Sequence, residues 1–153
     1  MRDELHEGRI TESIIGAFFA VYNELGFGLL ESLYSLAMER ELRSRRHEVA
    51  REVSVDVFYK GEPLGRQRLD MVVDRKVVVE IKSSIELSPT AIMQTLCYLR
   101  TTRLEVGLLL HFGPKARIKR LVSRKDVALR LTTLHSGPVA TEDACIQVPK
   151  SPT

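Results

Sequence analysis

The sequence predicts an α/β fold in which helices flank a mixed β-sheet, with the element order α-α-β-β-β-α-β-β. Three observations support this order. Two N-terminal segments have apolar residues at helical spacing, three strand-like segments with short turns follow, and a further helical segment precedes an apolar run at residues 106–111. A helix between two strands allows them to pair in parallel through a right-handed crossover, so the sheet is expected to be mixed.

The first helix is predicted from an apolar stripe near the N-terminus, formed by Ile10, Ile14, Ile15, Phe18, Phe19 and Tyr22. Thr11 is expected to be its N-cap, and Ile10 is expected to pack on Ile15 as a hydrophobic staple. The helix should end near Gly26. The corner at residues 26–28 then leads into a second helix.

The first three strands are predicted from their alternation and from the turns between them. Residues 49–59 alternate apolar and polar side chains, which is typical of a half-buried strand. Residues 60–65 are expected to form a turn, and residues 68–74 the next strand. A polar turn at residues 74–76 leads to the third strand, which begins with three valines.

The C-terminal half is predicted to add one helix and two strands. Ser88 as N-cap and Pro89 at the first helical position indicate a helix that runs to residue 101. Residues 106–111 form a short apolar strand, and residues 115–122, after a Gly-Pro break, form a basic edge strand.

Composition indicates a single globular domain. Of 153 residues, 44% are hydrophobic and 28% are charged. The domain is expected to span residues 1–131, and residues 132–153, rich in Thr, Ser and Pro, are expected to form a flexible tail. No apolar run approaches the length of a membrane span, and no signal peptide is apparent. Cys97 and Cys145 are expected to be reduced thiols in a cytoplasmic protein.

Asp70, Glu80 and Lys82 are the main candidates for chemistry. Glu80 and Lys82 are two residues apart in a strand, so their side chains should project from one face. If Asp70 and Glu80 flank the intervening turn symmetrically, their Cβ atoms lie about 5 Å apart. Two carboxylates at that distance repel unless one is protonated or a cation lies between them. A divalent metal is one interpretation, and a solvated strand face with a weak Glu–Lys pair is the other.

Two helical pairs accompany these residues. Glu31 and Tyr34 share a face of the second helix, and Gln94 and Tyr98 share a face of the third. Taken alone, Glu31 could simply be a first-turn acid that favours the helix dipole, and the Gln94–Tyr98 pair could be an amphipathic helix edge.

The ordered set of Gly28-x-x-Glu31, Asp70, Glu80-x-Lys82 and Gln94-x-x-x-Tyr98 resembles the PD-(D/E)XK nuclease superfamily. In particular it resembles the exonuclease-like branch that carries the glutamine–tyrosine helix. The segment at residues 28–34, GLLESLY, is similar to the naming motif of the small bacterial GxxExxY family. The resemblance covers roughly residues 10–122 and implies a restriction-endonuclease-like core.

The resemblance also implies roles for the motif residues. Glu31, Asp70, Glu80 and the main-chain carbonyl of Ile81 would bind Mg²⁺ or Mn²⁺, which prefer oxygen ligands. Lys82 would act on a water or on the phosphate, and Gln94 and Tyr98 would orient the metal-bound water or contact the nucleic-acid backbone. Two cysteines are too few for the four-cysteine iron–sulfur cluster that some relatives carry. His47 and His111 are given no role.

The predicted function is therefore metal-dependent hydrolysis of phosphodiester bonds in nucleic acid, with DNA favoured over RNA and no sequence specificity. Two alternatives stay open: a non-catalytic nucleic-acid-binding or accessory module, and a hydrolase of a small phosphorylated ligand. Association as a homodimer is also compatible with the sequence. The net charge is only +3, but basic residues cluster at 40–46 and at 115–130. Each cluster could be a solvated face or could bind phosphates.

Overall fold

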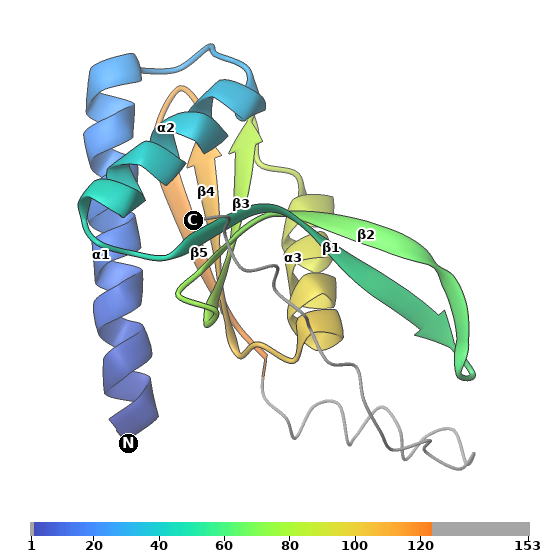
Figure 1. Ribbon diagram of the computed structural model, residues 1–153. Helices are drawn as coiled ribbons and strands as arrows, with labels where there is room; N and C mark the ends of the chain where they lie inside the picture. The colour runs from blue at the N-terminus through green and yellow to red at the C-terminus, as the bar shows by residue number, and fades with distance from the viewer. Residues whose placement is uncertain (1, 124–153) are drawn as a thin grey trace.

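Helices and strands follow one another in the predicted order in the computed structural model, which describes residues 2–123, with side chains from residue 7 onward (Figure 1). The helices are α1 (Arg2–Leu25), α2 (Glu31–Ser44) and α3 (Pro89–Thr102), and the strands are β1 (Val49–Tyr59), β2 (Glu62–Val73), β3 (Val77–Ser83), β4 (Val106–Phe112) and β5 (Ala116–Val122). The expected tail, residues 132–153, lies outside the described residues. None of the described helices is long and apolar enough to cross a membrane.

The strands form one mixed sheet in the order β1-β2-β3-β4-β5. The two strands joined through α3, β3 and β4, are parallel, and every other neighbouring pair is antiparallel. The edge position of β5 agrees with its prediction. The predicted fold class, a mixed sheet flanked by helices, is therefore confirmed.

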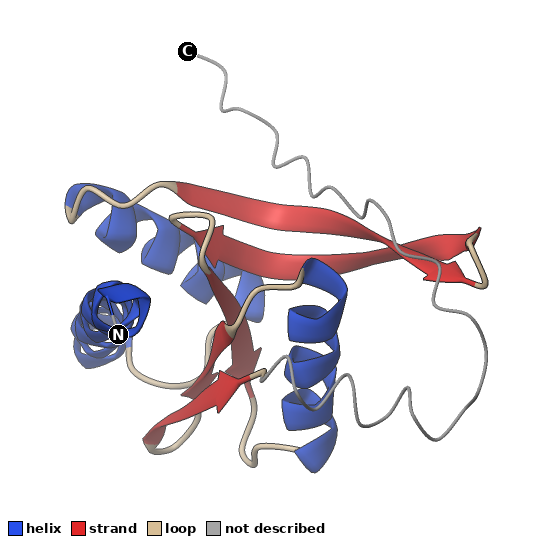
Figure 2. Ribbon diagram, turned by 90° about the horizontal axis from the view of Figure 1, so that it is seen from below, coloured by secondary structure: helices blue, strands red, loops and turns tan. Residues whose placement is uncertain are grey.

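Helices cover both faces of the sheet, with α1 and α2 on one side and α3 on the other (Figure 2). The valines at positions 77, 78 and 79 are all fully buried. Val77 and Val79 pack in the cluster with α1 and α2, and Val78 packs in the cluster with α3. A strand buried on both faces needs apolar residues at every position, which explains the continuous valine run before Glu80.

The start of α1 corrects two linked predictions. The helix begins at Arg2, so Thr11 lies inside it and is not an N-cap, and Ile10 also lies inside it and is not part of a hydrophobic staple. Its hydroxyl donates a hydrogen bond to the carbonyl of Gly8 at 2.9 Å, which is the local bonding that threonine commonly makes within a helix. The predicted end of the helix is confirmed, because Leu25 is its last residue.

The turn between β1 and β2 is also shorter than predicted. Tyr59 pairs with Glu62, so only Lys60 and Gly61 form the turn, and β2 begins six residues earlier than expected. Both turn residues have positive φ, 49° and 77°, as the favoured two-residue hairpin turn requires. Residues 62–66 are all exposed, so both faces of this part of the strand meet solvent and no apolar alternation marks it in the sequence.

The β1–β2 hairpin changes direction at Glu52 and Asp70. The residues on either side of them pair across the two strands, but Glu52 and Asp70 do not, and Glu52 has a φ of 52°. Before this point Val49 packs with the α1 and α2 cluster, and beyond it Val53 packs with the α3 cluster. The outer part of the hairpin consequently extends away from β3 (Figure 1).

Candidate active site

Asp70 and Glu80 lie where β2 and β3 separate. The last regular pair of these strands is Met71 with Val79, and each of the two acids is the direct neighbour of one member of that pair. Beyond that pair, side-chain carboxylates accept the hydrogen bonds of backbone N–H groups in place of the carbonyls of the opposite strand. The N–H of Asp70 donates to Oε1 of Glu80 at 3.1 Å, and the N–H of Ile81 donates to Oδ2 of Asp70 at 2.8 Å. The two carboxylates are therefore neighbours across the strands, as the symmetric turn predicted.

Glu80 is the buried member of this pair. It is 3% exposed, whereas Asp70 is half-buried. Burial, and after it the charge of Asp70, raise the pKa of Glu80 to about 8, although the Asp70 backbone N–H and the Lys82 ammonium act in the opposite direction. Without a cation, the pair therefore holds a proton at neutral pH.

Lys82 projects from the same face of β3 as Glu80, because the two are separated by one residue in a strand. Its side chain is half-buried, and its charge lowers the pKa of Glu80, so the two groups lie close together. None of the ion pairs among residues 7–123 involves Lys82. The ammonium is thus free to donate hydrogen bonds to a water or to a substrate oxygen.

Glu31, the first residue of α2, reaches the same edge of β3. Its Oε2 accepts a hydrogen bond from the N–H of Ser83 at 3.0 Å, and the Ser83 hydroxyl donates to the carbonyl of Leu29 at 2.7 Å. The N–H groups of residues 81 and 83 point to the same side of the strand and lie about 7 Å apart. The carboxylates of Asp70 and Glu31 therefore accept hydrogen bonds from two successive N–H groups on the same edge of β3.

Tyr34 holds the loop that presents Glu31. Its ring is fully buried and stacks on Phe112 with centroids 4.0 Å apart. Its hydroxyl donates to the carbonyl of Gly26 at 2.6 Å and accepts from the N–H of Leu29 at 3.2 Å. Within the loop Gly28 has a φ of 117°, a conformation that favours glycine. In the Gly-x-x-Glu-x-x-Tyr segment, the glycine and the tyrosine therefore fix the loop that positions Glu31.

The third helix brings Tyr98 and Gln94 to the carboxylate pair. The predicted start of α3 is confirmed, since the Ser88 hydroxyl accepts a hydrogen bond from the N–H of Thr90. Tyr98 is 4% exposed, and its pKa is raised by burial and then by the charges of Glu80 and Asp70, with a hydrogen bond to the exposed Gln94 side chain acting against them. The phenol consequently keeps its proton and can donate a hydrogen bond at this site.

The oxygen atoms at the strand separation suit a hard divalent cation. The carbonyl of Ile81 faces the same side as its N–H, toward Asp70, because both groups of a strand residue point one way. Two carboxylates and one main-chain carbonyl are donors that Mg²⁺ and Mn²⁺ accept. In residues 7–123 no three side chains of His, Cys, Asp or Glu form a ready metal site. The third acid, Glu31, is held apart by Ser83.

The structure gives both histidines structural partners. His47 contacts Asp74 at 2.6 Å and Ser13 at 2.7 Å, and so connects α1 to the turn after β2. His111 lies opposite Lys82 in the β3–β4 register, and its Nε2 lies 2.8 Å from the carbonyl oxygen of Ser84. Ser83 could not be predicted as a contact of Glu31, because a serine at the end of a strand has no distinctive spacing.

The two basic clusters differ in their pairing. Arg43 and Arg45 pair with Glu39 and Glu41 of their own helix, at 3.1 and 3.0 Å. They also lie at the end of α2 opposite Glu31, about 20 Å away along the helix axis. This cluster therefore does not flank the acids. The basic residues of β5 are exposed, and those at positions 124–130 lie outside the described residues.

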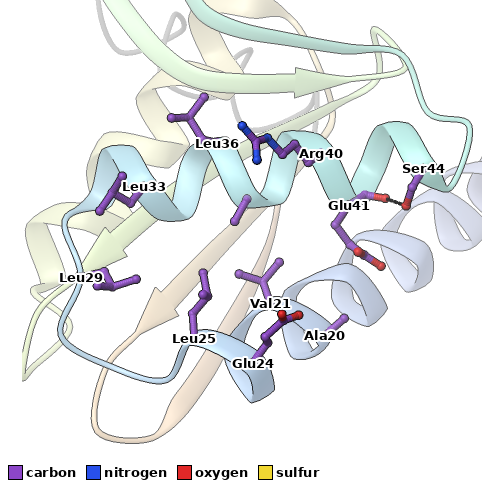
Figure 3. Close-up of a pocket in the computed structure, with 11 residues that line it drawn as sticks. Ala20, Val21, Glu24, Leu25, Leu29, Leu33, Leu36, Arg40, Glu41 and Ser44 are labelled. Carbon is purple, nitrogen blue, oxygen red and sulfur yellow. Dashed lines mark hydrogen bonds between the residues drawn. The ribbon is translucent and has the colours of Figure 1, made fainter.

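A groove of about 530 Å³ lies elsewhere, between α1 and α2 (Figure 3). It is lined mainly by apolar side chains, including Leu25, Leu29, Leu33 and Leu36, and it contains none of the candidate catalytic residues. An apolar groove does not suit a phosphorylated substrate, so the carboxylate pair is the better candidate site.

Comparison with known proteins identifies the family. The sequence model of the PD-(D/E)XK nuclease superfamily matches residues 8–123. The chain therefore belongs to the PD-(D/E)XK nuclease superfamily, and the predicted restriction-endonuclease-like core is confirmed. No curated protein matches the chain.

Two solved structures resemble it. One is described as SSO0001, with a TM-score of 0.50 and 20% sequence identity, covering 67% of this chain and 55% of that one. The other is an alkaline exonuclease, LHK-Exo, from Laribacter hongkongensis, with a TM-score of 0.49 and 14% identity, covering 67% and 60%. This chain matches less than two thirds of the length of either protein, and the likeness to SSO0001 concerns the fold alone.

Proposed function

We propose that this chain is a Mg²⁺- or Mn²⁺-dependent phosphodiesterase that cleaves nucleic acid, with DNA as its substrate in preference to RNA. The observation that carries the proposal is the contact between Asp70 and Glu80 at the strand separation, with Lys82, which forms no ion pair within residues 7–123, beside it. Two ionised carboxylates in a buried site repel each other, and a bound cation that replaces the shared proton removes this repulsion.

The proposed cation ligands are Asp70, Glu80 and the carbonyl of Ile81, with Glu31 completing the set once it leaves the N–H of Ser83. A bound cation lowers the pKa of its water and polarises the scissile phosphate. The fit rests on oxygen donors already fixed by backbone hydrogen bonds, so little reorganisation is needed.

The remaining residues act on substrate and water. Lys82 donates hydrogen bonds to the attacking water or to the phosphate oxygens, where negative charge increases during the reaction. Tyr98, which keeps its proton, and Gln94 donate from the α3 side and orient the water or the nucleic-acid backbone. No element of the described chain offers a recognition helix of known type, so binding is proposed to be independent of sequence.

The Gly28–Tyr34 segment supports assignment to the GxxExxY family within the superfamily, because its glycine and tyrosine both serve to present Glu31. The exposed free thiol of Cys97 supports a reducing, cytoplasmic environment. Cys145 lies outside the described residues.

A non-catalytic nucleic-acid-binding module is the second candidate. The separation of Glu31 from the other two acids favours it, because the metal site is then incomplete. As an accessory module or homodimer the chain would bind nucleic acid without cleaving it.

Cleavage assays separate the two candidates. Single-stranded DNA, double-stranded DNA and RNA would be incubated with Mg²⁺, with Mn²⁺ and with EDTA, using the wild type and Glu80→Gln. The enzyme proposal expects cleavage by the wild type that EDTA abolishes and that Glu80→Gln lacks. Glu86→Gln, at an exposed position near the same strand end, is the matched control and should cleave normally. Binding without cleavage in every condition would support the module.

A further inference from the structure

The strand β5 carries several basic side chains, which form no ion pair within residues 7–123. Lys115, Arg117, Lys119 and Arg120 lie on it or directly before it, and no acidic residue occurs between Glu105 and Asp126. Arg117, Lys119 and Arg120 are exposed, and none of the ion pairs among residues 7–123 involves them. Arg43 and Arg45 at the end of α2, by contrast, pair with Glu39 and Glu41.

The sheet register places part of this charge in line with the candidate site. Lys82 pairs with His111 across β3 and β4, and His111 pairs with Arg117 across β4 and β5. The next row, two residues earlier on β3, joins Glu80 and Lys119 through β4 in the same way. Residues directly opposite each other in a sheet project from the same face. Arg117 and Lys119 therefore share the face of Glu80 and Lys82.

Packing confirms which face this is. Leu121, two residues beyond Lys119, packs in the cluster with α3, whereas Ile118 packs in the cluster with α1 and α2. Arg120 lies two residues from Ile118 and so projects from the α1 and α2 face. One edge strand thus presents two cations on the site face and one on the opposite face.

The spacing suits a nucleic-acid backbone. Two strand intervals separate β3 from β5, about 10 Å. A duplex strand advances about 3.4 Å per nucleotide along its axis, so this distance corresponds to about three nucleotides. A backbone with one phosphate at Lys82 can therefore place a nearby phosphate at Arg117 or Lys119.

We propose that Arg117 and Lys119 form a phosphate-binding row along the exposed strand β5 that holds the nucleic-acid backbone beside the cleavage site, while the buried strand β4 sets their distance from it. This inference rests on the proposed function for its substrate. Basic residues on an edge strand can also serve only to prevent edge-to-edge association. That role depends on the strand edge and not on one face of the sheet, so Arg120 provides a matched control.

The test measures binding without metal and without cleavage. A fluorescein-labelled DNA duplex would be titrated in EDTA at several salt concentrations, and fluorescence anisotropy would give the affinity and its salt slope. Arg117→Gln and Lys119→Gln should each weaken binding and reduce the slope of log K against log salt by about 1, and the double variant by about 2. Arg120→Gln should leave the slope unchanged, and Arg117→Lys should retain it. Circular dichroism would verify that each variant is folded.

In the binding experiment, three results would overturn the inference: a wild-type slope in the double variant, an equal loss in Arg120→Gln, or self-association of the double variant with DNA binding intact. The nuclease proposal is tested separately. If the double variant cleaves DNA in Mg²⁺ with the KM of the wild type, the row is wrong and the nuclease stands. If no protein cleaves DNA but the slopes change as expected, the row stands and the nuclease is wrong.

Discussion

Two hydrogen bonds from the backbone link Asp70 and Glu80. The Glu80 carboxylate accepts one from the N–H of Asp70, and the Asp70 carboxylate accepts the other from the N–H of Ile81, the residue after Glu80. These two bonds stand where ladder bonds would continue if β2 and β3 stayed paired. The separation of the strands and the pairing of the acids are therefore the same structural feature.

Stability should fall as pH rises. The folded pKa of Glu80 is about 8, above its ordinary value of 4.5, so the folded protein binds a proton that the unfolded chain releases in this range. The contribution of this proton to the free energy of unfolding is fully present below about pH 4.5. It is lost gradually between about pH 4.5 and about pH 8, by no more than about 1.4 kcal/mol per pH unit. Urea unfolding of wild type and Glu80→Gln between pH 5 and 8 measures it.

Glu80→Gln should flatten this dependence, because an amide does not titrate. Glu86→Gln, which removes an exposed carboxylate, should keep the wild-type slope. Parallel curves for wild type and Glu80→Gln would show that Glu80 is not the group that binds the proton.

Metal binding should strengthen with pH over the same window. A cation at the carboxylate pair displaces the shared proton, so below about pH 8 the apparent affinity for Mn²⁺ should drop by up to about tenfold per pH unit. Calorimetry at pH 6, 7 and 8 in buffers of different ionisation enthalpy would detect the released proton. Asp70→Asn should bind Mn²⁺ much more weakly. An affinity that is independent of pH and unchanged in Asp70→Asn would place the metal elsewhere.

Tyr34→Phe should destabilise the protein by about 1–3 kcal/mol. The change leaves the carbonyl of Gly26 and the N–H of Leu29 without their buried partner. Tyr59→Phe is the matched control, since Tyr59 is 60% exposed and its change should stay within about 0.5 kcal/mol. Urea unfolding at a fixed pH compares them. Equal effects for the two tyrosines would mean that the Tyr34 hydroxyl contributes nothing to the loop.

The core of the site could be predicted from the sequence because it depends on local rules. The polar turn at residues 74–76 sets the pairing of the two strands, and the period of two then brings Asp70 beside Glu80 and puts Lys82 on the Glu80 face. The start of α3 depends on Ser88 and Pro89 alone and was equally predictable.

Other features depend on contacts distant in sequence. The φ of 52° at Glu52 is uncommon for glutamate and occurs where the packing of β1 changes from the α1 and α2 cluster to the α3 cluster. Nothing near Glu52 in the sequence indicates it. The early start of α1 was missed because residues 2–9 lack an apolar stripe. The bond from Ser83 to Glu31 joins residues 52 positions apart, beyond the reach of any local pattern.

The most direct measurement compares metal binding with DNA cleavage in the Lys82→Gln variant. Lys82 is proposed to act on water or phosphate and not on the cation, so calorimetry should give wild-type Mn²⁺ affinity within a few fold. Single-turnover cleavage of DNA in Mg²⁺ should be slower by about 10²–10³, the usual effect of losing one such electrostatic contact. Lys76→Gln, in the turn before β3, is the control and should cleave like the wild type. A wild-type protein that binds metal and yet cleaves neither DNA nor RNA at any pH would contradict the proposal, as would undiminished cleavage by Lys82→Gln.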